Sequence, residues 1–252
     1  MYCLTGRGQS PGEGRGDGDR PRREAMERLY RRFVKAGDLV FDVGAHVGMH
    51  TLAYAHLLRD VPQARILAFE PQSRLRAVLL KNLADNSLAG KVSVFPCALG
   101  HVNARTQMSA SVSDGPNANQ RIEYGGRRSY NLAGLALGKG GEPVQMRSLD
   151  SFGFPGCDFL KIDVEGFEPL VLFGALDLLR KHRPVVVYED LASKRITADM
   201  AEMFKLAEVP TCESIFSDLG GYRIHAFGCN YLAVPDGLED LLPAAKHGQA
   251  GT

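Results

Sequence analysis

The chain has 252 residues, of which 44% are hydrophobic and 23% charged, the balance of an ordinary globular protein. This length suits one α/β domain with a sizeable core. The formal net charge of +1 at pH 7 gives no electrostatic reason to expect nucleic acid or an anionic membrane as a partner.

The five cysteines are widely spaced, and none forms a C-x-x-C pair. Their odd number argues against a disulfide framework, and their spacing argues against a zinc site. The sequence has no apolar run of about 18 residues, which a transmembrane helix requires, and its N-terminus lacks the apolar segment of a signal peptide. We therefore expect free thiols, no membrane partner and a cytoplasmic location.

Three segments organise the chain. Residues 1–23 are Gly, Arg, Asp and Pro with almost no apolar content, and this composition predicts a disordered tail. Residues 24–240 are expected to form a single domain, and residues 241–252 a flexible tail. Apolar spacing in the first half of the domain predicts a helix from Glu24, a strand at 39–43, a helix at 49–59, a strand at 65–70, a helix at 75–83 and a strand at 92–96.

Residues 101–146 interrupt this rhythm and predict an insert, part loop and part hairpin, that covers the substrate as a lid. Its Arg121, Arg127, Arg128 and Tyr130 are candidate substrate contacts. After the insert we expect a strand at 159–163, a helix at 169–181, a strand at 184–189, a helix at 197–207 and a hairpin of 222–225 with 230–234. Alternating strands and helices indicate a doubly wound, mostly parallel α/β sheet, in which ligands bind beyond the carboxyl ends of the strands.

Asp42 lies in the last part of the first strand, and Gly44 and Gly48 follow in a turn that leads into a helix. Glycines allow a tight turn and let the backbone approach a ligand closely. A dinucleotide site would carry the fingerprint G-x-G-x-x-G, whereas this turn has two glycines. A carboxylate here would repel a pyrophosphate, but it suits a ligand that carries an ammonium group, as S-adenosylmethionine does.

The next two strand ends carry further pieces of such a site. Glu70-Pro71 follows the second strand, where an acid can accept hydrogen bonds from both ribose hydroxyls. Residues 97–100, with Ala98 among them, offer small side chains against which a purine ring could lie. Each piece is a weak signal alone. Their order at three successive strand ends predicts a site for a nucleoside-bearing cofactor.

Four blocks of the sequence resemble the FkbM family of methyltransferases. They are Gly37–Gly48, Phe69–Pro71 with the helix after it, Arg147–Asp150 and Phe159–Glu168. The fourth block continues through Val171-Leu172 and Gly174 to Arg183-Pro184 and Glu189, so the resemblance covers about residues 37–190 in order, apart from the insert. The Lys-Ile-Asp-Val-Glu-Gly stretch is the most family-specific. The resemblance implies a Rossmann-like class I methyltransferase fold, with a seven-stranded, mostly parallel sheet and a C-terminal antiparallel hairpin.

The resemblance also implies that the chain binds S-adenosylmethionine and releases S-adenosylhomocysteine. Members of the family mostly methylate hydroxyl oxygens on sugars or natural products. His46 stands where the family usually has Asn, and its side chain can still donate or accept a hydrogen bond. The cofactor-binding residues that we expect are Asp42, Gly44, Ala45, His46, Gly48, Thr51, Glu70, Pro71, Ala98 and Asp163.

Methyl transfer to a hydroxyl requires the two partners to be oriented and a proton to be removed. Asp163 ends the fourth parallel strand and Glu165 follows it, so both are candidate catalytic residues, as a general base or as ligands of a divalent metal. Two structural readings compete, in which Glu165 complements a helix dipole and Asp163 only binds the cofactor amine. We expect Lys161 to pair with an acid. Tyr188 and Glu189, at the end of the fifth strand, are candidate substrate residues.

The leading hypothesis is O-methylation of a hydroxyl on a small molecule or sugar, with RNA or protein as alternative acceptors. Neutral charge and the lack of an appended binding domain count against RNA. A nicotinamide-dependent oxidoreductase is disfavoured by Asp42 and the missing third glycine. A binding module that has lost catalysis is disfavoured by the presence of Asp163 and Glu165. The spacing of the histidines suggests no metal cluster, so no metal ligands are assigned, and metal use, acceptor and oligomeric state stay open.

Overall fold

The computed structural model describes residues 20–111, 135–189, 201–228 and 230–238. Its helices are α1 (Arg20–Phe33), α2 (Met49–Leu57), α3 (Ser73–Asp85), α4 (Glu168–Phe173), α5 (Leu176–His182) and α7 (Cys212–Leu219), with short 3-10 helices at Ala89–Lys91 and Leu149–Phe152. Its strands are β1 (Leu39–Val43), β2 (Arg65–Phe69), β3 (Val92–Phe95), β4 (Cys97–Leu99), β5 (Ala104–Ser109), β6 (Leu137–Gly138), β7 (Gly140–Arg147), β8 (Phe159–Ile162), β9 (Val185–Glu189), β10 (Tyr222–Phe227) and β11 (Asn230–Pro235).

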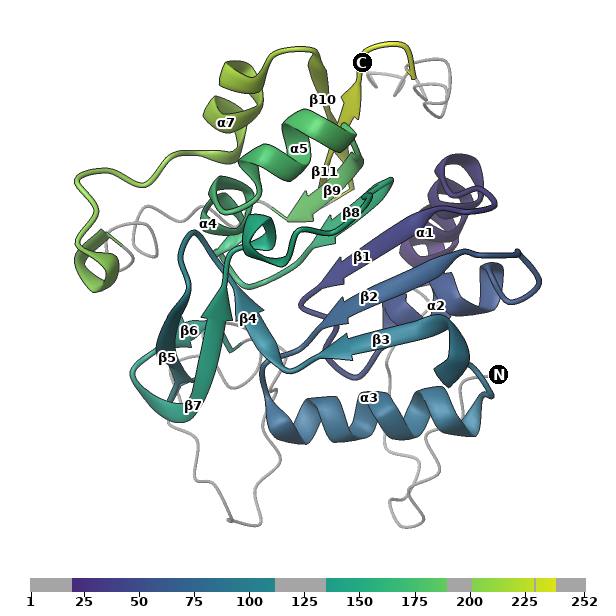
Figure 1. Cartoon of the computed structure of the whole chain (residues 1–252), viewed down its shortest axis with the longest axis horizontal. Helices are drawn as coiled ribbons and strands as arrows, with labels where there is room; N and C mark the ends of the chain where they lie inside the picture. The colour runs from purple at the N-terminus through teal and green to yellow at the C-terminus, as the bar shows by residue number, and fades with distance from the viewer. Residues whose placement is uncertain (1–19, 112–134, 190–200, 229, 239–252) are drawn as a thin grey trace, which may run out of the picture.

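The main sheet has seven strands in the order β10-β11-β9-β8-β1-β2-β3 (Figure 1). Strands β1, β2, β3, β8 and β9 are parallel, and β11 runs antiparallel to both β9 and β10. This confirms the predicted doubly wound, mostly parallel sheet with a C-terminal antiparallel hairpin. The chain reverses its strand order at β1, and ligands of such sheets bind at this switch point.

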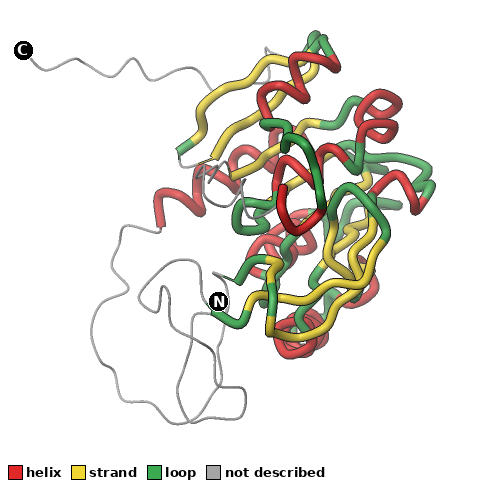
Figure 2. The backbone as a smooth tube through the Cα atoms, turned by 90° about the vertical axis from the view of Figure 1, so that its left-hand side faces the viewer, coloured by secondary structure: helices red, strands yellow, loops and turns green. Residues whose placement is uncertain are grey.

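Side chains alternate along each strand, so each strand contributes to two cores. Val40 of β1 packs with apolar residues of α1, α2 and α3, whereas its neighbour Phe41 packs with those of α4, α5 and α7. Helices therefore cover both faces of the sheet, and Figure 2 shows the strands in yellow between the red helices. The near-continuous apolar runs of β1, β8 and β9 follow from burial on both faces.

The register of the central strands brings three turns to one edge of the sheet. Val43 of β1 pairs with Phe69 of β2 and with Ile162 of β8. Each of these three residues is the last of its strand. The residues that come next, at positions 44, 70 and 163, therefore start at the same level, where the candidate site lies.

The described part of the insert is mostly strand. Strands β5, β6 and β7 form a second sheet with β4, in the order β4-β7-β5-β6. Figure 1 shows this sheet beside the carboxyl ends of β1, β2 and β3. The antiparallel pairing of β5 with β7 agrees with the predicted hairpin. Arg121, Arg127, Arg128 and Tyr130 lie outside the described residues.

The prediction of a strand at 92–96 was wrong about where that strand ends. β3 stops at Phe95, and Cys97 begins β4, which pairs with β7 of the second sheet. Pro96 stands between them, and proline has no N–H with which to continue a ladder of hydrogen bonds. The chain thus changes sheets at the carboxyl end of β3, which carries residues 97–99 to the candidate site.

The fourth predicted helix, at 169–181, is two helices, α4 and α5. They separate at Gly174, where a Cβ atom would lie 2.0 Å from the carbonyl oxygen of Gly100. The carboxylate of Asp150 accepts hydrogen bonds from the backbone N–H groups of residues 177 and 178, at 3.0 and 2.9 Å, and so caps the start of α5. The Arg147–Asp150 block therefore contains a structural cap.

Several other helices differ from the predictions. α1 begins at Arg20 rather than Glu24, because Pro21 is tolerated in a first helical turn. Residues 201–204 of the helix predicted at 197–207 are helical, and residues 197–200 lie outside the described ranges. α7 was not predicted, although its buried Cys212, Ile215 and Phe216 have helical spacing. No helix in the described ranges combines the length and the apolar character needed to cross a membrane.

Candidate functional site

The turn after β1 needs glycine at two positions. Gly44 has φ +80°, and a Cβ atom there would lie 1.8 Å from the carbonyl oxygen of Asp163. Gly48 has φ +94°, and a Cβ atom there would lie 2.5 Å from Leu79 of α3. The absence of side chains lets the turn pack directly against the end of β8 and against α3. The predicted turn is thus held close to the residues that follow β8.

Glu70, after β2, is fixed by the same turn. Its Oε2 accepts a hydrogen bond from the backbone N–H of His46, and its Oε1 accepts one from that of Gln72, both at 2.8 Å. His46 reaches this position with φ +53°, a left-handed conformation in which Asn, Asp and His are the enriched side chains. This explains why histidine can replace the family's usual asparagine.

Burial controls the ionisation of Glu70 and of His46. Glu70 is 3% exposed, and burial raises its pKa to about 7, although the two N–H groups oppose this shift. Burial lowers the pKa of the His46 imidazole below its usual range, and Lys161 adds to this shift while Asp163 opposes it. At neutral pH the site therefore combines a neutral imidazole with a carboxyl group near its midpoint.

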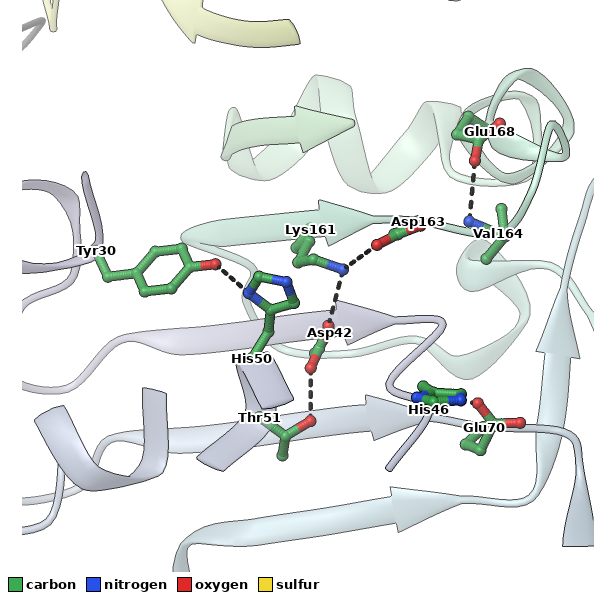
Figure 3. Close-up of polar contacts among 10 residues, drawn as sticks. All are labelled: Tyr30, Asp42, His46, His50, Thr51, Glu70, Lys161, Asp163, Val164 and Glu168. Carbon is green, nitrogen blue, oxygen red and sulfur yellow. Dashed lines mark hydrogen bonds and ion pairs between the residues drawn. The ribbon is translucent and has the colours of Figure 1, made fainter. Parts of the chain in front are cut away.

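Asp42 is fully buried in a polar network below the turn (Figure 3). Its Oδ2 accepts a hydrogen bond from Oγ1 of Thr51 at 2.5 Å, and its Oδ1 lies 3.6 Å from Nζ of Lys161. Asp42 and Lys161 are register partners on β1 and β8, so their side chains lie on the same face of the sheet. This confirms that Lys161 pairs with an acid.

Lys161 also donates a hydrogen bond to Oδ2 of Asp163 at 3.1 Å. Burial opposes the ionisation of both groups, but their mutual attraction outweighs it. The Lys161 ammonium lowers the pKa of Asp163, and the carboxylates of Asp163 and Asp42 raise the pKa of Lys161. Two further groups lower the pKa of Asp163. One is His50, whose Nδ1 lies 2.8 Å from the Tyr30 hydroxyl, and the other is Glu189, through a side-chain hydrogen bond. Asp163 is therefore held as an anion.

The turn after β8 contains two consecutive left-handed residues, Glu165 at φ +57° and Gly166 at φ +92°. A side chain at such an angle costs about 1–2 kcal/mol, so the surrounding structure must hold the turn. Glu168 supplies this, since its Oε1 accepts a hydrogen bond from the backbone N–H of Val164 at 2.9 Å. Glu168 is 1% exposed, and burial raises its pKa to about 8.

These turns enclose one side of a pocket with an empty volume of about 530 Å³, part of it open to solvent. Seven of the predicted residues line it, namely Gly44, His46, Glu70, Pro71, Ala98, Asp163 and Glu165. The other lining residues, most of them apolar, are Val43, Phe69, Gln72, Cys97, Leu99, Met108, Leu135, Leu137, Val164 and Phe167. Of these, Cys97 and Leu99 belong to the segment 97–100 that the sequence predicted beside the purine.

The other predicted site residues lie away from the lining of the pocket. Asp42 and Thr51 belong to the buried network, and Ala45 and Gly48 shape the turn. The remaining two are the candidate substrate residues. Tyr188 is buried against the rings of Phe216 and Tyr231, whereas Glu189 reaches Asp163 from the end of β9.

The pocket is lined by carboxylate, imidazole and thiol side chains, which are the groups that bind metal ions in proteins. Among the described residues, no group of three or more His, Cys, Asp or Glu side chains is arranged to hold a metal ion. Cys97 lines the pocket, and burial raises the pKa of its thiol to about 11, so it is a protonated wall residue at neutral pH.

The chain matches the family model described as the methyltransferase FkbM domain over residues 42–209. It is 30% identical over 163 residues to methyltransferase sdnD of Sordaria araneosa, which covers 56% of this chain and 61% of that protein. It is 32% identical over 177 residues to the 31-O-demethyl-FK506 methyltransferase FkbM of Streptomyces tacrolimicus, which covers 60% of this chain and 65% of that protein. The chain thus spans less than two thirds of the length of these curated relatives.

Solved structures resemble the chain more distantly. A crystal structure of methyltransferase FkbM from Methylobacillus flagellatus KT is 17% identical, with a TM-score of 0.48 over 79% of this chain and 43% of that chain. The O-methyltransferase TomG from Streptomyces achromogenes, solved with S-adenosylmethionine, is 14% identical, with a TM-score of 0.47 over 85% of this chain and 80% of that chain.

Proposed function

The chain belongs to the FkbM methyltransferase family, and we propose that it transfers a methyl group from S-adenosylmethionine to a hydroxyl oxygen of a small molecule. The observation that carries this proposal is the convergence of Glu70 and Asp163 on one pocket, on either side of the Gly44 turn. One acid suits ribose hydroxyls and the other suits a cation, and S-adenosylmethionine carries both groups.

Glu70 is the residue proposed to hold the ribose. Two backbone N–H groups already occupy one lone pair on each of its oxygens, which fixes the carboxylate at the edge of the pocket. Each oxygen keeps a second lone pair that can accept from a hydroxyl. Pro71 and Ala98 offer small apolar surfaces beside it for the purine.

Asp163 is proposed to hold the positive end of the cofactor. It lines the pocket, whereas its contacts Lys161 and Glu189 are not among the lining residues. Thr51 holds Asp42, Asp42 pairs with Lys161, and Lys161 in turn fixes the position of Asp163. Asp42 is thus proposed as a positioning residue, which gives the predicted acid of the first turn an indirect part in cofactor binding.

Glu165 is proposed to accept the proton of the acceptor hydroxyl. When bound, S-adenosylmethionine supplies an electrophilic methyl carbon and leaves as S-adenosylhomocysteine. The acceptor oxygen loses its proton to the Glu165 carboxylate as it forms the new bond to carbon. The left-handed backbone of Glu165 supports this role, because strained side-chain-bearing residues concentrate at functional turns.

Calorimetric titration with S-adenosylhomocysteine, with NADH in parallel, tests the cofactor class. Binding of S-adenosylhomocysteine alone is the expected result, and binding of NADH alone would overturn the proposal. Asp163→Asn should weaken S-adenosylhomocysteine binding, whereas Glu165→Gln should preserve binding and lower kcat about 100-fold, within the range for loss of a general base. A parallel assay in excess chelator tests whether a divalent metal takes part.

A further inference from the structure

One wall of the pocket is apolar and belongs to the insert. Met108 on β5, Leu137 on β6 and Leu135 just before β6 all line the pocket. Met108 and Leu137 are register partners across the two strands. Met108 and Leu135 are buried, and Leu137 is half-buried. None of these residues lies on the strand ends to which the ribose and the cofactor cation are assigned.

This wall extends to the reacting end of the pocket. Met108 and Leu135 share a buried hydrophobic cluster with Phe167, and Val164 packs against that cluster. Val164 and Phe167 flank Glu165 in the sequence, and all three line the pocket. The insert wall is therefore continuous with the apolar residues around the carboxylate that is proposed to take the proton.

The charges around the pocket have one sign. Within the described ranges, the lining contains the carboxyl groups of Glu70, Asp163 and Glu165, and it contains no Lys or Arg side chain. Lys161 is 4% exposed and lies behind Asp163, to which it is bonded. Among the described residues, no cation lines the pocket to compensate the charge of a phosphorylated or carboxylated acceptor.

We propose that the methyl acceptor is an uncharged, largely apolar alcohol, and that Leu137 and Met108 of the insert sheet select it. This inference rests on the proposed methyl transfer and names its substrate class. Burial of an apolar flank of the acceptor against this wall is favourable, because it removes apolar surface from water. The many hydroxyls of a sugar would face the same wall without hydrogen-bond partners, which costs free energy.

A matched acceptor panel tests the substrate class. Transfer of a tritiated methyl group from S-adenosylmethionine is measured with three apolar alcohols, namely cyclohexanol, menthol and a sterol. It is also measured with methyl glucoside, and with the phosphate monoester of a diol analogue of each alcohol, which keeps one free hydroxyl. The expected kcat/KM for at least one apolar alcohol exceeds that for the glucoside and for the phosphate esters by about tenfold or more. Preference for the glucoside or for a phosphate ester, or transfer to none of the apolar alcohols, overturns the proposal.

The variant Leu137→Gln tests the wall itself. We expect the KM for the preferred apolar alcohol to rise about tenfold while S-adenosylhomocysteine affinity changes less than about twofold. Leu80→Gln is the matched control, because Leu80 is 50% exposed on α3 and does not line the pocket. A comparable loss of S-adenosylhomocysteine affinity in Leu137→Gln would place the wall against the purine and overturn the assignment. Failure of the wild-type chain to bind S-adenosylhomocysteine would instead refute the proposed function.

Discussion

Glu70 and Asp163 follow the two strands that flank β1, and their surroundings control their charge in opposite ways. Glu70 is held by two backbone N–H groups, and burial raises its pKa to about 7. Asp163 is held by the Lys161 ammonium, which keeps its pKa low despite burial. The backbone donors fix the position of the Glu70 carboxyl group but not its charge. The buried Lys161 ammonium fixes both the position and the charge of Asp163.

This difference suits the two proposed roles. A group that binds neutral hydroxyls works by accepting hydrogen bonds, and it tolerates a pKa near neutrality. A group that binds a cation must be ionised at every working pH, and a full positive charge behind it secures this. Substitutions at these acids and in the buried network around them test the contrast.

Lys161→Met should have the largest effect, because it leaves the fully buried Asp42 and the half-buried Asp163 without their shared cation. Removal of one partner of a buried ion pair costs about 3–5 kcal/mol of unfolding free energy. Urea denaturation at pH 7 measures it. Lys81→Met is the matched control, since Lys81 pairs with Asp85 on the exposed surface of α3 and such pairs contribute less than about 1 kcal/mol. Equal losses in the two variants would contradict the buried network.

Glu168→Gln should stabilise the fold as the pH rises. The pKa of Glu168 is about 8 in the folded chain against 4.5 as its ordinary value. The stability that its protonated form contributes is complete below about pH 4.5 and is lost as the pH rises to 8. The variant should match wild type near pH 4.5 and exceed it at pH 7 by on the order of 3 kcal/mol. Parallel stability curves for the two proteins would show that Glu168 is not buried as a neutral acid.

Gly44→Ala should lower S-adenosylhomocysteine affinity about tenfold or more, because its Cβ atom would displace the backbone of Asp163. Gly37→Ala is a close control. Gly37 has φ +87°, similar to Gly44, but nothing lies within 4 Å of its Cβ position. Both variants lose about 1–2 kcal/mol of stability to the left-handed backbone, and Gly44→Ala loses more because its Cβ atom also overlaps the backbone of Asp163. Calorimetry separates them, and equal affinities would show that the close approach of the turn to β8 has no part in binding.

The sequence predicted the elements that depend on local pattern. Strand ends follow from apolar runs, and parallel strands end at one edge, so Gly44, Glu70 and Asp163 were predicted to meet. The inward direction of Asp42 was not predictable in the same way. It depends on the register of β1 with β8, which pairs Asp42 with Lys161, and these residues are far apart in the sequence.

Two further features of the site had weaker signals. Glu168 begins the apolar run of α4, and a lone acid beside such a run indicates a buried carboxyl group. No role was predicted for it from the sequence. Met108, Leu135 and Leu137 occur in a polar insert, where nothing local indicates that they face a pocket. Their arrangement follows from the pairing of β5 with β6, a long-range contact that composition does not reveal.

The last prediction separates the two acids by pH. Because the pKa of Glu70 is about 7, its carboxylate is lost as the pH falls from 8 to 6, and a protonated carboxyl accepts fewer hydrogen bonds from the ribose. The affinity for S-adenosylhomocysteine should therefore fall a few-fold over this range, while Asp163 stays ionised throughout. Glu70→Gln should bind about tenfold more weakly at pH 8, as expected for loss of hydrogen bonds to a charged acceptor, and should show no such pH dependence.

Glu142→Gln is the control for this last comparison. Glu142 also accepts from a backbone N–H, that of Ser73, but it does not line the pocket. Its replacement should leave the wild-type pH dependence in place. His46 must be separated as well, since it is a second titratable group of the same turn and burial lowers its pKa from 6.5. If His46→Asn abolished the pH dependence and Glu70→Gln preserved it, the imidazole and not the carboxylate would control cofactor affinity, and the contrast between the two acids would not extend to binding.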